Sequence, residues 1–562
     1  MALRRRVTEF LESRRPGWLD ARGAVLGLTD RDGLLAAVPV GVQDAFTGRA
    51  VEEDTRFEIG SISKSFAAIV AMQLVEAGLL DLQAPVTTYV PWFEVRSPHG
   101  AITAHHLLTH TAGLIMGMDF ADDAVPPVWS LRGTSVGAAP GERYHYSNDG
   151  YKLLGLILET LGGAPWPQML RERVLEPLGM SHSDPEITYD TAEDIAAPHH
   201  REAIDRPPNR ARLLVRAPVS ISRTVDGSII STAEDMATYA RMLLNRGAYA
   251  GGRLLSEESF ALMTTPHVTD TGDEGVAYGY ALDLFEVEGR AHVGHSGGMV
   301  GHYALLWCDM DTGIGAAMMV NGHGEREPSV RFALDAARAS LSGAELPAVP
   351  PPPDPLATPF AAELAGEYTA DDGRTIAVGG TIAVGETIAV GETIVLKEED
   401  GRLLARIEPG GDVTLEPLED LWEDEGGGVG FAVPIASMDR FALGVERDTT
   451  GSVVALTHGP ARYLRSGAPS QPDVTPPADA EILCGTYRIW NPWAPGFRVF
   501  ARSGRLWLAW PSSEAPLRPL DDGEWRVGDD PGFDRVRFDT IVGGAAQHAV
   551  YNAVPYTRSF VD

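Results

Sequence analysis

Residues 57–64 read FEIGSISK, and they place a serine, Ser61, three positions before a lysine, Lys64. Lysine is scarce here: among 46 basic residues, only Lys64, Lys152 and Lys397 are lysines, and the other two follow no such serine. Arginine stays protonated in proteins, whereas a desolvated lysine can lose its proton. The stretch therefore predicts a base beside a potential nucleophile.

Apolar residues continue after Ser61 at helical spacing as far as Gly78. This pattern predicts a mostly buried helix with Ser61 at its start and Lys64 one turn further along the same face. The free N–H groups and the dipole of a helix N-terminus favour negative charge on a serine oxygen. Burial favours the uncharged amine of a lysine, which makes Lys64 a candidate base. The alternative is an ordinary helix cap followed by a surface charge.

Composition excludes several classes of partner. The net charge of −32 over 562 residues argues against binding to nucleic acid or to an anionic membrane, since either would be repelled. No stretch approaches the length of a membrane span, and no apolar segment follows the basic residues near the N-terminus, so we expect no signal peptide and a cytoplasmic location. Cys308 and Cys484 lie far apart, so a disulfide framework is not expected. The oligomeric state is left open.

Two proline-rich stretches, residues 347–355 and 470–477, divide the chain. Long helical patterns dominate before the first stretch, and short alternating runs with Gly and Asp turns dominate after it. We therefore predict a mixed α and β domain at 1–345, a linker at 346–357, a β domain at 358–467, a linker at 468–478 and a second β domain at 479–562.

The two β regions begin alike. Residues 364–368 read LAGEY, residues 483–487 read LCGTY, and each region later carries Gly-Arg-Leu, from Gly401 and from Gly504. This similarity indicates two copies of one small β unit. A hexad, TIAVGG or TIAVGE, also repeats from residue 375. Because its period is even, added hexads keep Ile and Val on one face of a strand, which predicts a lengthened β ribbon.

Two further segments carry chemistry-bearing residues. A turn-rich loop holds Tyr146 and Asn148 just before an apolar helical pattern. A tyrosine there can pass a proton, and the asparagine can donate to a substrate carbonyl. Residues 294–298 read GHSGG and precede a strand-like run, so their small residues would let a substrate backbone lie against a strand edge. Alone, the tyrosine is more often a packed aromatic, and His295 is more often structural.

Together the three segments resemble the serine β-lactamase and penicillin-binding protein superfamily, in particular its peptidase S12 and esterase branch. In that family SxxK, YxN and K/H-x-G elements meet in one cleft, and here they are matched in chain order by Ser61 with Lys64, Tyr146 with Asn148, and His295 with Gly297. The resemblance covers roughly residues 15–340. It implies an α/β (α+β) penicillin-recognising domain with a central antiparallel sheet, and two antiparallel β-barrel-like domains would follow it, as in D-aminopeptidases.

The resemblance also implies a mechanism of covalent acyl transfer. Ser61 would attack a carbonyl, while Lys64 and Tyr146 move its proton to the leaving group. Backbone N–H groups of Ser61 and Gly298 would form the oxyanion hole, and Asn148, Ser296 and Gly297 would bind substrate. Neither a cofactor nor a metal is expected. The residue that would activate water for deacylation is left open.

One residue departs from the β-lactamase pattern, because His295 stands where those enzymes have a lysine. A lysine there is cationic and binds a substrate carboxylate, whereas a histidine is largely neutral at pH 7. The leading interpretation is a serine hydrolase of small amides or peptides, similar to D-aminopeptidases. The alternatives are an esterase of the same family and a penicillin- or peptide-binding protein with slow turnover.

Overall fold

The computed structural model describes residues 1–117, 121–358, 360–371, 393–407, 412–418, 430–436, 438–469, 478–491, 493–529 and 534–559. The complete hexads of residues 375–392 lie outside this described part. The chain forms two units, one of residues 1–200 and 215–352, the other of residues 201–214 and 353–562. The domain boundaries expected from the proline-rich stretches stay a proposal.

The first unit is built on a seven-stranded antiparallel sheet, which confirms the predicted central sheet. In spatial order its strands are β2 (Leu34–Gly41), β1 (Gly23–Asp30), β13 (Ile314–Val320), β12 (His302–Asp309), β11 (Arg290–Met299), β10 (Asp283–Val287) and β9 (Val276–Tyr278). The first two strands of the chain therefore lie beside the last three of this unit. Only long-range pairing can complete such a sheet.

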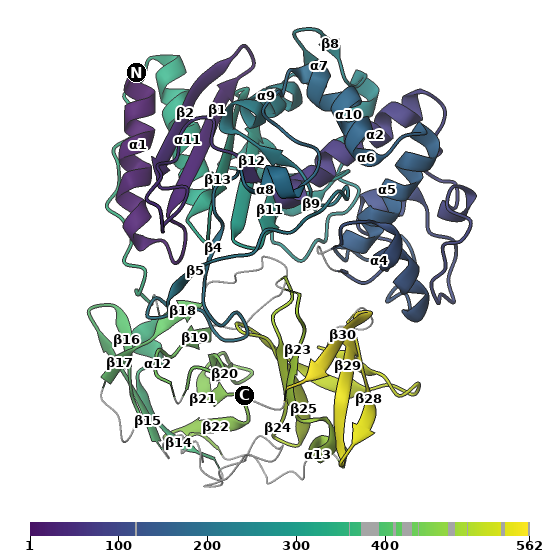
Figure 1. Ribbon diagram of the computed structural model, residues 1–562. Coiled ribbons are helices and arrows are strands. Elements are labelled where there is room, and N and C mark those ends of the chain that lie inside the picture. The colour runs from purple at the N-terminus through teal and green to yellow at the C-terminus, as the bar shows by residue number, and fades with distance from the viewer. Residues whose placement is uncertain are drawn as a thin grey trace. The chain divides into compact units, whose positions relative to one another are not determined.

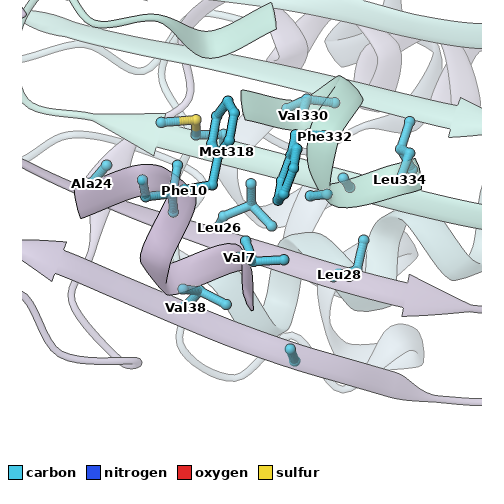
Figure 2. Packing of buried hydrophobic residues seen from close by; sticks show 14 of the residues in the cluster. Val7, Phe10, Ala24, Leu26, Leu28, Val38, Met318, Val330, Phe332 and Leu334 are labelled. Atoms are coloured by element: carbon cyan, nitrogen blue, oxygen red, sulfur yellow. The ribbon is translucent and has the colours of Figure 1, made fainter. Parts of the chain in front are cut away.

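Helices α1 (Ala2–Arg14) and α11 (Arg326–Ser342) cover one face of the sheet (Figure 1). Figure 2 shows Phe10 and Phe332 between these helices and the strand residues Leu26 and Met318. The two phenyl rings stack with centroids 4.1 Å apart. The buried apolar residues of α1 therefore cover this face of the sheet.

The opposite face of the sheet carries α9 (Ala233–Leu244), which packs on β1 and β13. A Cβ atom at Gly27 would lie 2.2 Å from the carbonyl oxygen of Ala233, so glycine is needed for this close approach. Beyond α9 lies a helical region with α2 (Ser63–Glu76) in contact with α5 (Asn148–Gly162). Most of α2 is buried, as its apolar pattern predicts.

Shorter elements complete the first unit. They are η1 (Arg15–Gly17), β3 (Phe57–Glu58), η2 (Gly60–Ile62), η3 (Val86–Thr88), α3 (Ala104–Leu108), α4 (Val125–Ser130), η4 (Leu131–Gly133), α6 (Trp166–Leu170), η5 (Arg171–Leu175), α7 (Glu176–Leu178), α8 (Tyr189–Ala192), β6 (Ile230–Ser231), β7 (Ala248–Tyr249), β8 (Gly252–Arg253) and α10 (Glu257–Met263). Strand β3 pairs with β6, and η2 and α2 follow β3 directly in the chain.

The second unit holds a nine-stranded, nearly closed sheet and a closed eight-stranded barrel, which confirms the predicted barrel-like regions. After α12 (Ala361–Leu364), the nine-stranded sheet comprises β14 (Gly366–Ala370), β15 (Thr393–Glu399), β16 (Arg402–Ile407), β17 (Asp412–Thr414), β18 (Glu416–Leu418), β19 (Gly430–Ala432), β20 (Leu443–Arg447), β21 (Val453–His458) and β22 (Ala461–Arg465). After α13 (Ala480–Leu483), the barrel comprises β23 (Gly485–Arg488), β24 (Phe497–Arg502), β25 (Arg505–Ala509), β26 (Glu514–Pro519), β27 (Trp525–Val527), β28 (Arg535–Val542), β29 (Ala545–Tyr551) and β30 (Val554–Arg558).

The similar openings of the two β regions fold alike. In each, a short helix precedes the first strand, and a buried tyrosine donates a hydrogen bond of 2.8 Å to a helix carbonyl four residues earlier, Tyr368 to Leu364 and Tyr487 to Leu483. Each Gly-Arg-Leu begins at a two-residue hairpin loop, in which both residues have positive φ. Glycine suits the second position of such a turn.

Residues 201–214 leave the first unit and belong to the second. The strands β4 (His199–Arg201) and β5 (Leu214–Arg216) form a two-stranded ribbon at the two ends of this segment. Asp205 lies 2.8 Å from a guanidinium nitrogen of Arg488 and 3.1 Å from one of Arg498. The sequence did not indicate that residues 201–214 belong to the second unit, because the ion pairs that hold them there join residues almost 300 positions apart.

Candidate active site

Ser61 lies in the single turn η2, directly before α2, and the side chain of Lys64 reaches back to it. The Nζ atom of Lys64 is 2.9 Å from the Oγ of Ser61 and donates to the backbone oxygen of Asp226 at 2.8 Å. Lys64 is fully buried, so it is no surface charge. The side chains of Ser61 and Lys64, which the sequence predicts to be neighbours, therefore lie at hydrogen-bond distance.

Two glycines, Gly60 and Gly297, allow η2 to lie against strand β11. A Cβ atom at Gly60 would lie 2.6 Å from the backbone nitrogen of Gly298, and one at Gly297 would lie 2.0 Å from the carbonyl oxygen of Ile59. Gly60 also has a φ of +52°, which favours glycine. Only residues without side chains allow this contact. It places the backbone nitrogen of Gly298 beside the turn that carries Ser61, and the predicted role of the two N–H groups as an oxyanion hole stays a prediction.

Tyr146 and Asn148 stand at the start of α5, where the side chain of Ser147 caps the helix by accepting from Gly150 N–H at 2.9 Å. The Nζ of Lys64 lies 4.8 Å from the centroid of the Tyr146 ring. Asn148 is 4% exposed, and its Oδ1 has no hydrogen-bond partner among the described residues. A buried amide oxygen without a partner is suited to accepting a hydrogen bond from a bound molecule.

His295 lies on β11 and is buried in the same cluster, with its ring centroid 6.4 Å from that of Tyr146. Its Nδ1–H donates to the carbonyl of Ser296, so its Nε2 accepts from the hydroxyl of Tyr278 at 3.1 Å. Burial lowers the pKa of His295 to about 4, and the charge of Lys64 acts in the same direction, while the Ser296 carbonyl opposes them. His295 is therefore neutral at pH 7.

The structure adds aromatic and histidine neighbours that the sequence did not single out. The ring of His110 lies 4.2 Å from that of Tyr146, and its Nδ1 accepts from the N–H of Ser147 at 3.0 Å. Burial, together with nearby Lys64, holds the pKa of His110 well below its usual range. Its positive φ of 55° is rare for histidine and could have marked it only once the fold was known. Tyr278 likewise looks like an ordinary strand residue in sequence.

Lys152 and Asp226 are the other residues that sequence reasoning missed. Lys152 is fully buried in α5, and its Nζ lies 2.9 Å from a carboxylate oxygen of Asp226. The scarcity of lysine was the available signal, but no spacing connects this lysine with a serine or with an aspartate 74 positions away. The predicted residues Ser61, Lys64, Tyr146 and His295 lie together, and their catalytic roles stay predictions.

The sequence matches the beta-lactamase family over residues 3–340, and the chain belongs to this family. It is a serine hydrolase of the β-lactamase-related kind. Penicillin-binding protein 4 of Amycolatopsis lactamdurans is 31% identical over 356 residues, which cover 61% of this chain and 92% of that protein. Esterase EstB of Burkholderia gladioli is 32% identical over 199 residues, which cover 32% of this chain and 50% of the esterase.

Solved structures share the fold. The octameric penicillin-binding protein homologue from Pyrococcus abyssi has a TM-score of 0.54 at 23% identity, covering 83% of this chain and 99% of that one. The D-amino acid amidase from Ochrobactrum anthropi SV3 has a TM-score of 0.50 at 24% identity, covering 60% of this chain and all of its own. Among the described helices, none is long and apolar enough to cross a membrane.

Proposed function

We propose that this chain hydrolyses small amides or peptides through an acyl-enzyme on Ser61, with a preference similar to that of D-aminopeptidases. The observation that carries the proposal is the 2.9 Å contact between Lys64 Nζ and Ser61 Oγ. A lysine at this distance and shielded from water can accept the proton of a serine that attacks a carbonyl carbon.

In the first half of the reaction, the Oγ of Ser61 forms a bond to the substrate carbonyl carbon as its proton passes to Lys64. The N–H groups of Ser61 and Gly298 stabilise the negative oxygen. Collapse breaks the bond to the leaving amine, which receives a proton through Tyr146. Water then attacks the ester on Ser61, releases the acid and returns the serine proton.

The state of His295 supports a substrate without a carboxylate at this position. A neutral imidazole that is already held by Tyr278 and the Ser296 carbonyl supplies no full positive charge to a substrate anion. Penicillins and C-terminal peptides carry such an anion, whereas an amino-terminal amide or an ester does not. The amidase of Ochrobactrum anthropi, a structure of the same fold, is in keeping with this direction.

An esterase is the second candidate, because the same uncharged environment suits an ester and EstB is 32% identical over 199 residues. A panel of D-alanine p-nitroanilide, its L counterpart, a p-nitrophenyl short ester and a chromogenic cephalosporin separates the candidates. We expect the D-anilide to be cleaved faster than the L form and the cephalosporin. Turnover of the ester alone would overturn the peptidase proposal in favour of the esterase.

Two variants complete the panel. Ser61→Ala should abolish turnover, and Ser342→Ala, an exposed serine at the end of α11, should leave it unchanged. Unchanged activity in Ser61→Ala would refute the site. A mass increase on Ser61 that persists with negligible turnover would favour a slow-turnover binding protein.

A further inference from the structure

Three charged side chains are buried together behind the candidate active site. The Nζ of Lys152 lies 2.9 Å from the Oδ2 of Asp226 and 3.4 Å from the Oδ1 of Asp149. Lys152 is 0% exposed, and the two aspartates are 1% and 3% exposed. Lys152, Asp149 and Asp226 are called the charge triad below. Its two aspartates come from segments 77 positions apart in the chain.

The charge triad touches the reacting groups through the backbone. The carbonyl oxygen of Asp226 accepts a hydrogen bond of 2.8 Å from the Nζ of Lys64. Asp149 follows Asn148 in the chain, and its carboxylate fills the space where a Cβ at Gly117 would come within 2.1 Å. Lys152 therefore connects two parts of the site. One is the segment of Asp226, whose carbonyl accepts a hydrogen bond from Lys64, and the other is the start of α5, which carries Tyr146 and Asn148.

Stability alone is a weak reason for such an arrangement. Buried ion pairs are often no more stable than neutral side chains of the same shape, because desolvation offsets the attraction between the charges. The triad also carries an uneven charge. Burial raises the pKa of Asp149 to about 6, with Lys152 opposing this effect and Asp226 adding to it. Above that pH the triad bears two carboxylates against one ammonium.

The net charge of the triad matters because of what else surrounds Lys64. Among the described residues, the groups that face it from the neighbouring elements include the hydroxyl of Ser61, the rings of Tyr146 and Tyr151, and the imidazoles of His110 and His295. Both imidazoles are neutral near pH 7 because their pKa values are lowered. A net negative triad therefore favours the protonated amine of Lys64, and a neutral triad favours the free base.

We propose that the charge triad positions Lys64 against Ser61 and controls how readily this lysine releases its proton, with Lys152 as a positioning residue. This inference rests on the proposed function, because it assumes that Lys64 activates Ser61. Lys152 touches neither Ser61 nor the substrate in this scheme. It acts through the carbonyl of Asp226.

The test follows covalent labelling of Ser61 by a fluorophosphonate across pH, since this probe requires an activated serine but no particular substrate. The main variant is the triple change Lys152→Met, Asp149→Asn and Asp226→Asn, which removes all three charges and keeps the side-chain shapes. We expect the acidic limb of the labelling rate to move to lower pH by about one unit. If the acidic limb of the variant's labelling rate lies at the same pH as that of the wild type, the inference is overturned, whatever the labelling rate on the plateau.

Asp226→Asn alone provides a second route if the triple variant does not fold. It keeps the backbone carbonyl and leaves Lys152 paired with Asp149, so it also removes the net negative charge. The limb should move in the same direction, and an unmoved limb in this folded variant would again overturn the inference. Lys397→Met, which changes an exposed lysine, is the matched control and should label like wild type.

The outcomes separate the two proposals. If wild-type Ser61 is not labelled, or if Ser61→Ala is labelled equally, the proposed function fails and this inference fails with it. If Ser61 is labelled and the limb does not respond to the charge triad, only the inference fails. A merely structural triad would alter the melting temperature without moving the limb.

Discussion

The three lysines of this chain occupy three different environments. Lys64 is buried and contacts a serine hydroxyl and a backbone carbonyl. Lys152 is equally buried but lies between two carboxylates. Lys397 is exposed on β15 of the nine-stranded sheet. The residue type and burial of the first two are the same, so only their partners distinguish a candidate base from a fixed countercharge.

The difference has a physical origin. An ammonium between two carboxylates is held in its charged form, whereas a hydroxyl and a backbone carbonyl, two oxygen partners of Lys64, give a desolvated ammonium less support. Proton transfer requires an environment like that of Lys64. The carboxylates around Lys152 instead help to order the segments that surround it. Substitutions at the three positions should therefore affect different properties of the protein.

The largest effect is expected at the candidate base. Lys64→Met should lower the rate of acylation by about 10³-fold, because general-base assistance is lost while the site keeps its shape. The labelling rate of Ser61, with Lys397→Met as the control, measures this loss. Acylation within tenfold of wild type would mean that another group takes the proton.

At the charge triad, the main expected effect is on stability. Lys152→Met leaves two buried carboxylates without their cation, which should lower the free energy of unfolding by about 3 to 5 kcal/mol. Urea unfolding followed by circular dichroism checks the value. The triple neutral variant should recover most of the loss, and a loss below about 1 kcal/mol in Lys152→Met would show that water reaches the triad.

The pH dependence of the unfolding free energy should reveal the raised pKa of Asp149 in the folded protein. Its folded-state pKa of about 6 lies above the ordinary value of 3.8, so folding favours the protonated acid. Its contribution to stability is therefore greatest below pH 4 and falls as the pH rises through 6, by roughly 2 to 3 kcal/mol. The measurement is the difference in unfolding free energy between wild type and Asp149→Asn at several pH values. A difference independent of pH would contradict the assignment.

The smallest effect is expected at Lys397. Because this side chain is exposed, Lys397→Met should change the unfolding free energy by no more than about 0.5 kcal/mol and leave the labelling rate unchanged. Thermal melts and the fluorophosphonate assay test both statements together. A loss of activity here would reveal a role for the β region in the reaction.

Much of the fold was predictable because the relevant signals are local. The apolar spacing after Ser61 predicted the buried helix α2. The shared sequence pattern Leu-x-Gly-x-Tyr predicted that the two β regions begin alike. Their hairpins follow from glycine at a position with positive φ. The transfer of residues 201–214 to the second unit had no such signal, since its ion pairs join distant parts of the chain.

The sequence alone determined the contact between Ser61 and Lys64, because a spacing of three residues at a helix start leaves the two side chains side by side. It also indicated which three segments form the candidate site. Tertiary structure decided the rest. The burial that makes His295 neutral, and the meeting of Lys152 with Asp226, both depend on elements that approach only when the sheet and helices pack. Charge states respond to that surrounding medium, which no local spacing specifies.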